Sequence, residues 1–326
     1  MRTIVLNEQN IVGQNNNTLI YQFPSSVDLT GCEVAVSNIT MYYSWDNINS
    51  ATLQNNIFTY SWTQGATTTT YTVNIPNGLY ELADINAYLQ FTMIQNGTYL
   101  TNTTSGQNVY YAEFIINPTQ YAVQINTFPV PTSFAGFTAP TNITTGLTLV
   151  PPTTTFNPVI TLPANFNELL GYSVNFATDN NVGGGNILSY LSTQAPQLQP
   201  NSSLLIAMNG IDNKYANPNT IIYSVAPNVA LGDLIVEKPA QFNFNRMLSG
   251  TYNQLRLQFL GNDLRPVVIR DANMTIILVI KDQDDLFADI GASRVHNSGG
   301  LTHQAQLRSG ATNSAGSITG TGFRRF

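Results

Sequence analysis

Charged residues are scarce in this chain of 326 residues: Asp, Glu, Lys and Arg together make up 9% of it. Soluble domains typically contain about 25%. Hydrophobic residues, at 43%, are close to the usual share, so Asn, Thr, Gln, Ser and Tyr supply the missing polarity. We therefore expect a neutral surface rich in hydrogen-bonding groups, which suits extensive packing against other protein.

Basic residues are missing from most of the chain. No Lys or Arg occurs between Arg2 and Lys214, while ten acidic residues do. The last 41 residues carry Asp289 against four arginines, a net charge of +3, so the other 285 residues sum to −6 − 3 = −9. An acidic body does not wrap a phosphate backbone, and four dispersed arginines make a poor electrostatic footprint, so direct nucleic acid binding is not expected.

Histidine and cysteine are almost absent as well. Both histidines, His296 and His303, lie near the end of the chain, and Cys32 is the single cysteine, so no disulfide can form within it. Ser/His or Cys/His nucleophile pairs and Cys/His zinc sites therefore lack their residues in the body. The longest apolar run, residues 274–280, is too short to span a bilayer. The first residues lack the apolar region of a signal peptide, which predicts a cytosolic site of folding.

The remaining chemical motifs are weak, and we expect no catalytic residues, no cofactor and no metal site. The glycine-rich stretch "NVGGGN" at 181–186 lacks the Lys-Ser/Thr ending of a phosphate loop. The acidic residues lie mostly in predicted turns and at strand ends, although a glycosidase-like carboxylate pair stays possible. Oxygen ligands for calcium could come from Asp282, Asp284 and Asp285 with Asp263 or Asp271. A sugar-binding platform could come from Tyr42, Tyr43, Trp45 and Trp62, but aromatic residues on strands are more often core.

Strand patterns occur along most of the chain. Runs rich in β-branched and aromatic residues, bounded by Asn, Gly, Pro or Asp, lie at 18–23, 33–45, 56–62, 69–75, 109–116, 121–128, 203–208, 220–225, 252–260 and 274–280. Residues 252–260 alternate, with Leu255, Leu257 and Phe259 on one face, as in a half-buried strand. Residues 274–280 are apolar on both faces, which predicts an interior strand with Ile277 buried. The turn "LGNDLRP" between these two strands predicts a hairpin.

One helix interrupts the strands. In residues 79–97, Ile85, Leu89 and Met93 recur four apart and Asn96-Gly97 offers a stop. A weaker helical pattern covers 165–172, and the Pro/Thr/Gly-rich stretch 129–165 is expected to be a long ordered connection. The predicted fold is all-β: a jelly-roll β-sandwich with an insertion or extra β region and one short helix. We assign residues 1–285 to the body, with the insertion within 97–165, and 286–326 to an extended C-terminal arm.

Six stretches of the chain, taken together and in order, resemble a known family of proteins. They are "CEVAVSNITMYYSWDNI", "IPNGLYELADINAYLQFTMIQNGTYL", "YYAEFIINPTQYAVQINTFPVP", "NFNELLGY", "DNKYANPNTIIYSV" and "GTYNQLRLQFLGNDLRPVVIRDANMTIILVIK". In this order the chain resembles the penton (vertex, or minor capsid) proteins of virophages, Polinton-type elements and large DNA viruses. The resemblance spans most of 18–281 and is architectural, since each piece is a strand or helix pattern.

The resemblance implies a structural virion protein rather than an enzyme. It implies a jelly roll, five copies of which fill each icosahedral vertex among trimers of the major capsid protein, in a virion assembled in the host cytoplasm. Two alternatives stay open: a major capsid protein with two tandem jelly rolls, and a carbohydrate-binding or glycosidase β-sandwich acting in attachment.

The arm after about residue 286 is not covered by the resemblance. Its composition resembles that of segments that order only on binding a partner. Its last four residues, Phe323, Arg324, Arg325 and Phe326, combine two aromatic anchors with two donors for carboxylates or carbonyls. We therefore predict that these four bind a partner, either neighbouring capsid protein or an internal minor or cement protein.

Overall fold

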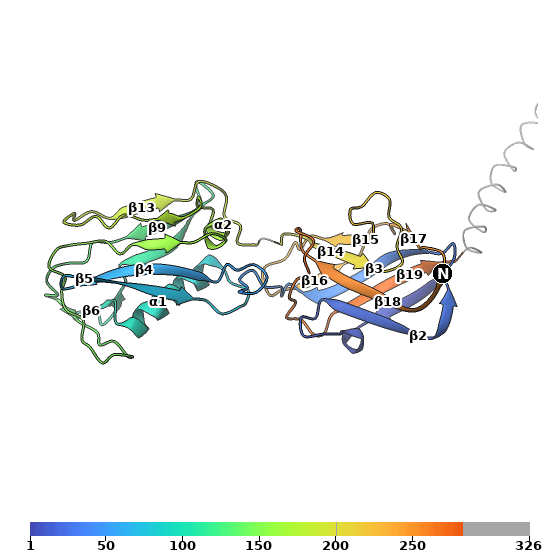
Figure 1. Cartoon of the computed structure of the whole chain (residues 1–326), viewed down its shortest axis with the longest axis horizontal. Coiled ribbons are helices and arrows are strands. Elements are labelled where there is room, and N and C mark those ends of the chain that lie inside the picture. Colours follow the sequence, from blue (N-terminus) through green and yellow to red (C-terminus); the bar gives the residue numbers. More distant parts are fainter. Residues whose placement is uncertain (200, 283–326) are drawn as a thin grey trace, which may run out of the picture.

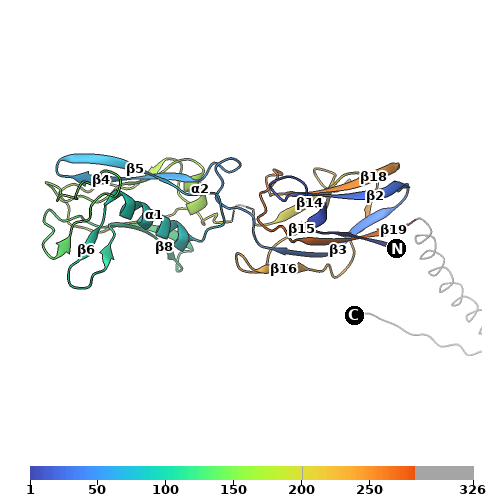
Figure 2. The same cartoon turned by 90° about the horizontal axis from the view of Figure 1, so that it is seen from below.

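A computed structural model describes residues 1–199 and 201–282, which form two lobes lying end to end along the long axis (Figures 1 and 2). Each lobe has its own hydrophobic core. Core residues of the first lobe come from Ile4–Trp45 and Leu204–Ile280. Those of the second run from Ile48 to Tyr172, with partly buried residues out to Leu198. The chain thus enters the second lobe once and leaves it once, and the predicted insertion range 97–165 lies within it.

The first lobe is a sandwich of two antiparallel sheets. Its strands are β1 (Arg2–Leu6), β2 (Thr18–Asp28), β3 (Glu33–Tyr42), β14 (Leu204–Met208), β15 (Ile221–Val225), β16 (Leu234–Glu237), β18 (Thr251–Leu260) and β19 (Thr275–Lys281), with the short β17 (Asn245–Arg246) and the 3-10 helix η1 (Glu8–Asn10). One sheet has the order β1-β19-β3-β16, with β17 also on β3, and the other β15-β14-β18-β2. Leaving β17 aside and numbering the strands along the chain, these orders are 1-8-3-6 and 5-4-7-2, the arrangement of a jelly roll.

The alternation predicted for 252–260 is confirmed. Leu255, Leu257 and Phe259 of β18 are fully buried, and they belong to the same core as Ile276 and Leu278 of β19. The predicted hairpin between these strands is wrong, because β18 and β19 belong to different sheets. Strands β18 and β19 each have one apolar face, and the two apolar faces meet in the core between the sheets. The residues that connect the strands therefore cross from one sheet to the other.

Strand β19 is interior in the sense that it pairs with β1 on one side and β3 on the other. Its residues Ile276, Leu278 and Ile280 belong to the core. Ile277, predicted to be buried, is only half-buried. It pairs with Val5 and Asn38 on the outer face of the sheet. A strand in the middle of a sheet need not be covered on both faces, and apolar composition alone does not reveal the difference.

The second lobe combines three small sheets with two helices. Its elements are β4 (Ile57–Gln64), β5 (Thr67–Asn74), α1 (Leu82–Asn96), β6 (Leu100–Asn102), β7 (Asn108–Val109), β8 (Ala112–Asn117), β9 (Ala122–Thr127), β10 (Phe137–Thr138), β11 (Ile160–Leu162), α2 (Phe166–Leu170), β12 (Phe176–Ala177) and β13 (Leu188–Leu191). The sheets are β12-β11-β4-β5, β13-β9-β8 and β10-β6-β7, so the jelly-roll order is not repeated. The stretch 129–165 contains β10 and β11 and contributes Val130, Leu149 and Phe156 to this core.

Helix α1 confirms its sequence pattern. Ile85, Leu89 and Met93 are completely buried against the second core. The helix ends where predicted, since Gly97 has a φ of 65° and its backbone N–H bonds back to the last turn. A side chain at Gly97 would be strained by that φ and would approach Asn142 N to 2.8 Å, so glycine is required for this turn. Within the described residues, no helix is long and apolar enough to cross a membrane.

Candidate interaction surfaces

The four residues predicted to bind a partner, Phe323–Phe326, lie outside the described residues, as does the whole predicted arm, 286–326. Their role therefore stays a prediction. The described chain ends at Asp282, whose carboxylate accepts a bond from Cys32 Sγ at 3.7 Å and pairs with Arg2 Nε at 3.0 Å. Burial raises the pKa of the Cys32 thiol, with a further contribution from the charge of Asp282.

The aromatic residues considered for a sugar platform do not form one. Tyr43 and Trp45 pack on each other in the first core, with ring centroids 4.3 Å apart. Trp62 belongs to the second core and contacts Tyr111 and Phe156 edge-on. Only Tyr42 is exposed. Three of the four side chains thus serve packing within their own lobe.

The carboxylates considered for calcium are also separated, where the structure describes them. Asp282 lies beside Cys32, just before β3 begins, whereas Asp271 accepts the backbone N–H of Tyr42 at 2.8 Å, where β3 ends. The ten residues of β3 correspond to about 30 Å of strand. Asp284 and Asp285 lie outside the described residues. Among those described, no group of three or more His, Cys, Asp or Glu is placed to hold a metal ion.

Among the described residues, the titratable groups with the largest pKa shifts are buried or half-buried tyrosines. Burial raises the pKa of Tyr43 and of Tyr111 to about 12, and that of Tyr223 to about 12 with help from the nearby Glu237. Burial also raises the pKa of Tyr60 and Tyr172 well above the usual value. All five phenols therefore stay protonated to a higher pH in the folded protein than in a free tyrosine.

We therefore expect alkaline unfolding. A phenol whose pKa is raised in the folded state binds its proton more tightly there than in the unfolded chain, where the pKa is about 10. The stability that these phenols contribute is complete below about pH 10 and is lost as pH rises through about 12. A pH titration that records tyrosinate absorbance and far-ultraviolet circular dichroism on the same samples checks this. These five tyrosines should ionise over the pH range in which the circular dichroism signal is lost. Ionisation of every tyrosine at pH 10 in a protein that stays folded would contradict the assignment.

The outer face of the sheet β1-β19-β3-β16 is one candidate contact surface. Val5, Tyr42, Leu234 and Val236 are each about half exposed there. They share the face by register, since Leu234 lies opposite Tyr42 and Val236 opposite Thr40. This face therefore presents apolar and threonine side chains on a regular strand surface.

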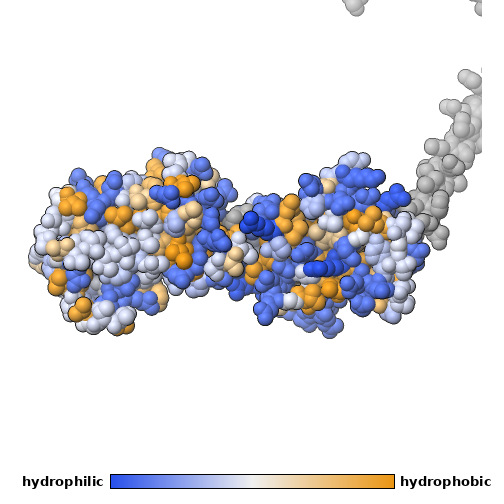
Figure 3. Space-filling view, in the orientation of Figure 1, coloured by the Kyte–Doolittle hydropathy of each residue, from blue (hydrophilic) through white to orange (hydrophobic). Residues whose placement is uncertain are grey.

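A second candidate is the hairpin of β4 and β5 in the second lobe. Its outer face is a ladder of hydroxyl residues, with Thr59 opposite Thr72 and Thr63 opposite Thr68. Figure 3 shows a pale area, neither hydrophilic nor hydrophobic, in the lobe where Figure 1 places β4 and β5. Among the strands that the structure describes, β5 pairs only with β4, and it contains no charged residue and no proline. Edge strands of soluble proteins are commonly protected by such residues, so this edge is open to another chain.

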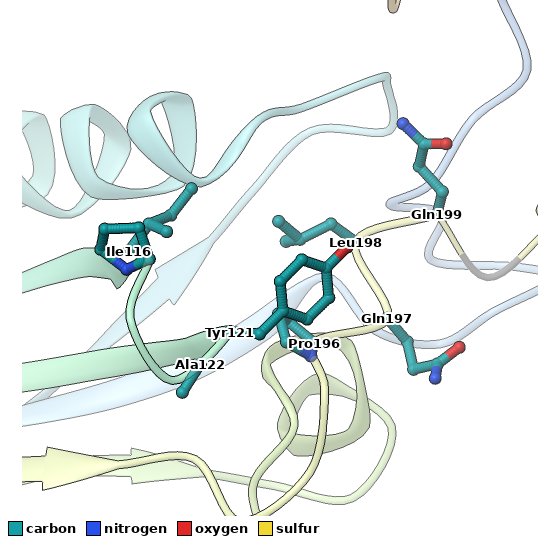
Figure 4. A pocket seen from close by; sticks show the side chains of 8 residues that line it. Ile116, Tyr121, Ala122, Pro196, Gln197, Leu198 and Gln199 are labelled. Atoms are coloured by element: carbon teal, nitrogen blue, oxygen red, sulfur yellow. The ribbon is translucent and has the colours of Figure 1, made fainter. Parts of the chain in front are cut away.

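Two adjoining hollows form a third candidate. The first, which we call the apolar hollow, has a volume of about 590 Å³ and is lined by Ile116, Pro118, Tyr121, Ala122, Pro196, Gln197, Leu198 and Gln199. Figure 4 shows Tyr121 beside Leu198 and Pro196, with Gln197 and Gln199 pointing away in different directions. The second, which we call the acidic hollow, has about 430 Å³ and shares Gln197 with the first; it is lined by Leu53, Asn55, Asn165, Glu168, Leu169, Gln194 and Gln197. The apolar hollow has no charged residue in its lining, and the acidic hollow has only Glu168.

The apolar hollow exists because two distant segments meet. Residues 118–121 connect β8 to β9, and residues 196–199 lead back toward the first lobe. Tyr121 has a φ of 52°, a left-handed conformation unusual for an aromatic residue. Tyr121 is 77% exposed. Sequence patterns predict the two strands but not this surface. The turn sequence "NPTQY" at 117–121 gives one indication of it, because a tight turn does not itself require the aromatic side chain of Tyr121.

A polar junction holds the two lobes together. The carboxylate of Asp46, just after β3, accepts bonds from Arg270 Nε at 2.8 Å and Nη2 at 3.0 Å, and from Asn49 Nδ2 at 2.9 Å. Arg270 also donates to the carbonyl of Asn77 at 3.1 Å. Beside it, Asn47 Nδ2 donates to the carbonyls of Tyr80 and Leu198, both at 2.7 Å. These bonds tie the chain entering the second lobe to the chain leaving it and to the first lobe.

Comparisons with known proteins give similarities among solved structures alone. No protein family model matches the chain, and no curated protein matches it. Among solved structures the chain is similar to the crystal structure of the selenomethionine-labelled mavirus penton protein, with a TM-score of 0.40 and 11% sequence identity over 86% of this chain and 97% of that chain. We draw no functional conclusion from a likeness at this level.

Proposed function

We propose that this protein is a structural component of an icosahedral virus capsid, a penton of which five copies form each vertex. The observation that carries the proposal is a jelly roll of eight principal strands in a chain with 9% charged residues, with one connection expanded into a separate lobe. The sequence resemblance to penton proteins supports the same role. A subunit that only builds a shell needs broad, weakly charged faces and no reaction centre.

The proposal includes the partners and the place of assembly. The partners are four further copies of the chain, the surrounding trimers of the major capsid protein and internal minor or cement proteins, and the C-terminal arm binds either neighbouring capsid protein or one of these internal proteins. The protein would be found in the virion and assembled in the host cytoplasm. Direct contact with nucleic acid is not part of the proposal, because residues 1–285 have a net charge of −9, the difference between −6 for the chain and +3 for its end.

The other readings have less support. The second lobe does not repeat the jelly-roll strand order, which favours a penton over a major capsid protein with two tandem jelly rolls. The aromatic group considered for a sugar platform does not assemble on the surface, because Tyr43, Trp45 and Trp62 are each at most 2% exposed and Tyr42 alone of the four is exposed.

We expect native mass spectrometry of the purified protein to give a pentamer of about 178 kDa, five times the 35.6 kDa of one chain. Because closed symmetry favours one oligomer size and the surface has few charges, the pentamer should persist between about 0.1 and 1 M salt. Single-particle images should show fivefold rings. A trimer would favour the major capsid reading, and monomers at all concentrations and in virions would contradict the penton.

A further inference from the structure

The second lobe has a charge imbalance that its own residues do not balance. Residues 47–199 contain no Lys, Arg or His, but they contain Glu81, Asp84, Glu113, Glu168 and Asp179. No cationic side chain of this lobe can therefore pair with these carboxylates, and an arginine from another segment can do so. Of these five, Glu168 lines the acidic hollow, and it is exposed.

The apolar hollow adjoins it at Gln197. Its lining combines Tyr121 and two prolines with aliphatic side chains and carries no charge. Pockets of this size and composition take one or two apolar side chains, and a few polar groups at the rim fix their orientation. Gln197 lines both hollows, and its amide can donate to and accept from a bound backbone, whereas the Gln199 amide oxygen accepts the hydroxyl of Tyr43.

The chain itself carries a segment with the matching chemistry. Residues 283–326 lie outside the described structure, and their sequence ends in Phe323-Arg324-Arg325-Phe326. We propose that these four residues of a neighbouring copy bind across the two hollows: Phe323 in the apolar hollow, and the adjoining arginines on Glu168 in the acidic hollow. This inference rests on the proposed oligomer. It makes a second copy of the same chain the binding partner of the C-terminal arm.

The order of the residues fits the order of the hollows. Phe323 and Arg324 are adjacent in the chain, about 3.3 Å apart in an extended segment, and the two hollows adjoin at Gln197. Arginine binds carboxylates through two parallel hydrogen bonds, which adds direction as well as attraction. A phenylalanine next to it supplies the buried anchor.

A neighbouring copy is the source that the position of Asp282 favours. The described chain ends in the part of the first lobe that is remote from the second lobe (Figures 1 and 2). From there to Phe323 are 41 residues, which extend to at most about 135 Å. To reach the hollows of the same chain, the segment would have to run back along the whole first lobe. The same length also allows the segment to reach the hollows of a neighbouring copy in a closed ring.

Photo-crosslinking in the full-length protein tests the inference. Phe323→p-benzoylphenylalanine places the reactive group at the proposed anchor, and Leu301→p-benzoylphenylalanine serves as the control within the same segment. Mixing chains with normal and heavy nitrogen separates links between copies from links within one. We expect cross-links from position 323, between copies, to peptides containing 116–122 or 196–199, and none from position 301 to these peptides.

Two further variants test the chemistry. Glu168→Gln should lower the cross-link yield at least fivefold, whereas Asp179→Asn, which removes the same charge from the same lobe, should not change it. Tyr121→Asn removes the aromatic wall, keeps a residue that tolerates a positive φ, and should also lower the yield at least fivefold. Native mass spectrometry of the same samples reports the oligomer separately. Cross-links to other surfaces, or only within one chain, in a protein that is still pentameric would overturn this inference and leave the proposed function standing. If the wild-type protein forms no pentamer, the proposed function itself is contradicted.

Discussion

Replacing Leu278 with aspartate should prevent the protein from folding. Leu278 is completely buried in the first core. It sits on the central strand β19, opposite Ile4 of β1 and Val36 of β3. A carboxylate there would have neither water nor a partner, and burying such a group costs several kcal/mol. Since the whole stability of a domain is only about 5–15 kcal/mol, we expect aggregated protein or a collapsed circular dichroism signal.

The neighbouring residue provides the matched control. Ile277→Asp makes the same change one position earlier on the same strand, but Ile277 is half-buried on the outer face. Its carboxylate can reach water, so we expect a soluble, folded protein with a loss of about 1–2 kcal/mol. Chemical denaturation of both variants measures the difference. Equal behaviour of the two would show that the assignment of faces on β19 is wrong.

Replacing Asp46 with alanine should loosen the connection between the lobes. The Asp46 side chain is 3% exposed and takes three hydrogen bonds, two of them from Arg270. Hydrogen bonds to charged groups contribute about 1.5–3 kcal/mol. Arg270 is 53% exposed and can be hydrated when its partner is lost. We therefore expect a loss of about 2–3 kcal/mol rather than the full penalty of a buried unpaired charge.

Hydrogen exchange and small-angle scattering distinguish a local from an interlobe effect. In Asp46→Ala, the amides around residues 47–49 and 77–80 should exchange faster, and the scattering curve should indicate a wider range of lobe orientations. Asp46→Asn keeps the shape and one acceptor oxygen, so it should give a smaller change in both. Unchanged exchange at 47–49 and 77–80 in the alanine variant would mean that the junction does not depend on this carboxylate.

The sequence determines the elements of this protein. The alternation at 252–260 and the four-residue spacing of Ile85, Leu89 and Met93 are confirmed, and the predicted strand run 33–45 forms β3 over Glu33–Tyr42. These patterns depend on backbone preferences and side-chain periodicity within a few residues. The position of Gly97 also fixes the end of α1 without reference to the rest of the fold. The scarcity of charge and the concentration of arginine at the end of the chain are likewise properties of the sequence alone.

The tertiary structure decided which elements are partners. The same turn residues can close a hairpin or lead a chain across a sandwich, and "LGNDLRP" does the second because β18 and β19 each have a face to bury in the same core. Whether Ile277 or Leu278 is buried depends on what lies over each face of the sheet, and nothing on β19 itself encodes that. The hollows at Tyr121 and Glu168 arise only when 117–121, 165–169 and 194–199 are brought together by the second core. Contacts between residues so far apart in the chain are selected by the packing of the whole lobe, because local preferences are equally satisfied by many pairings.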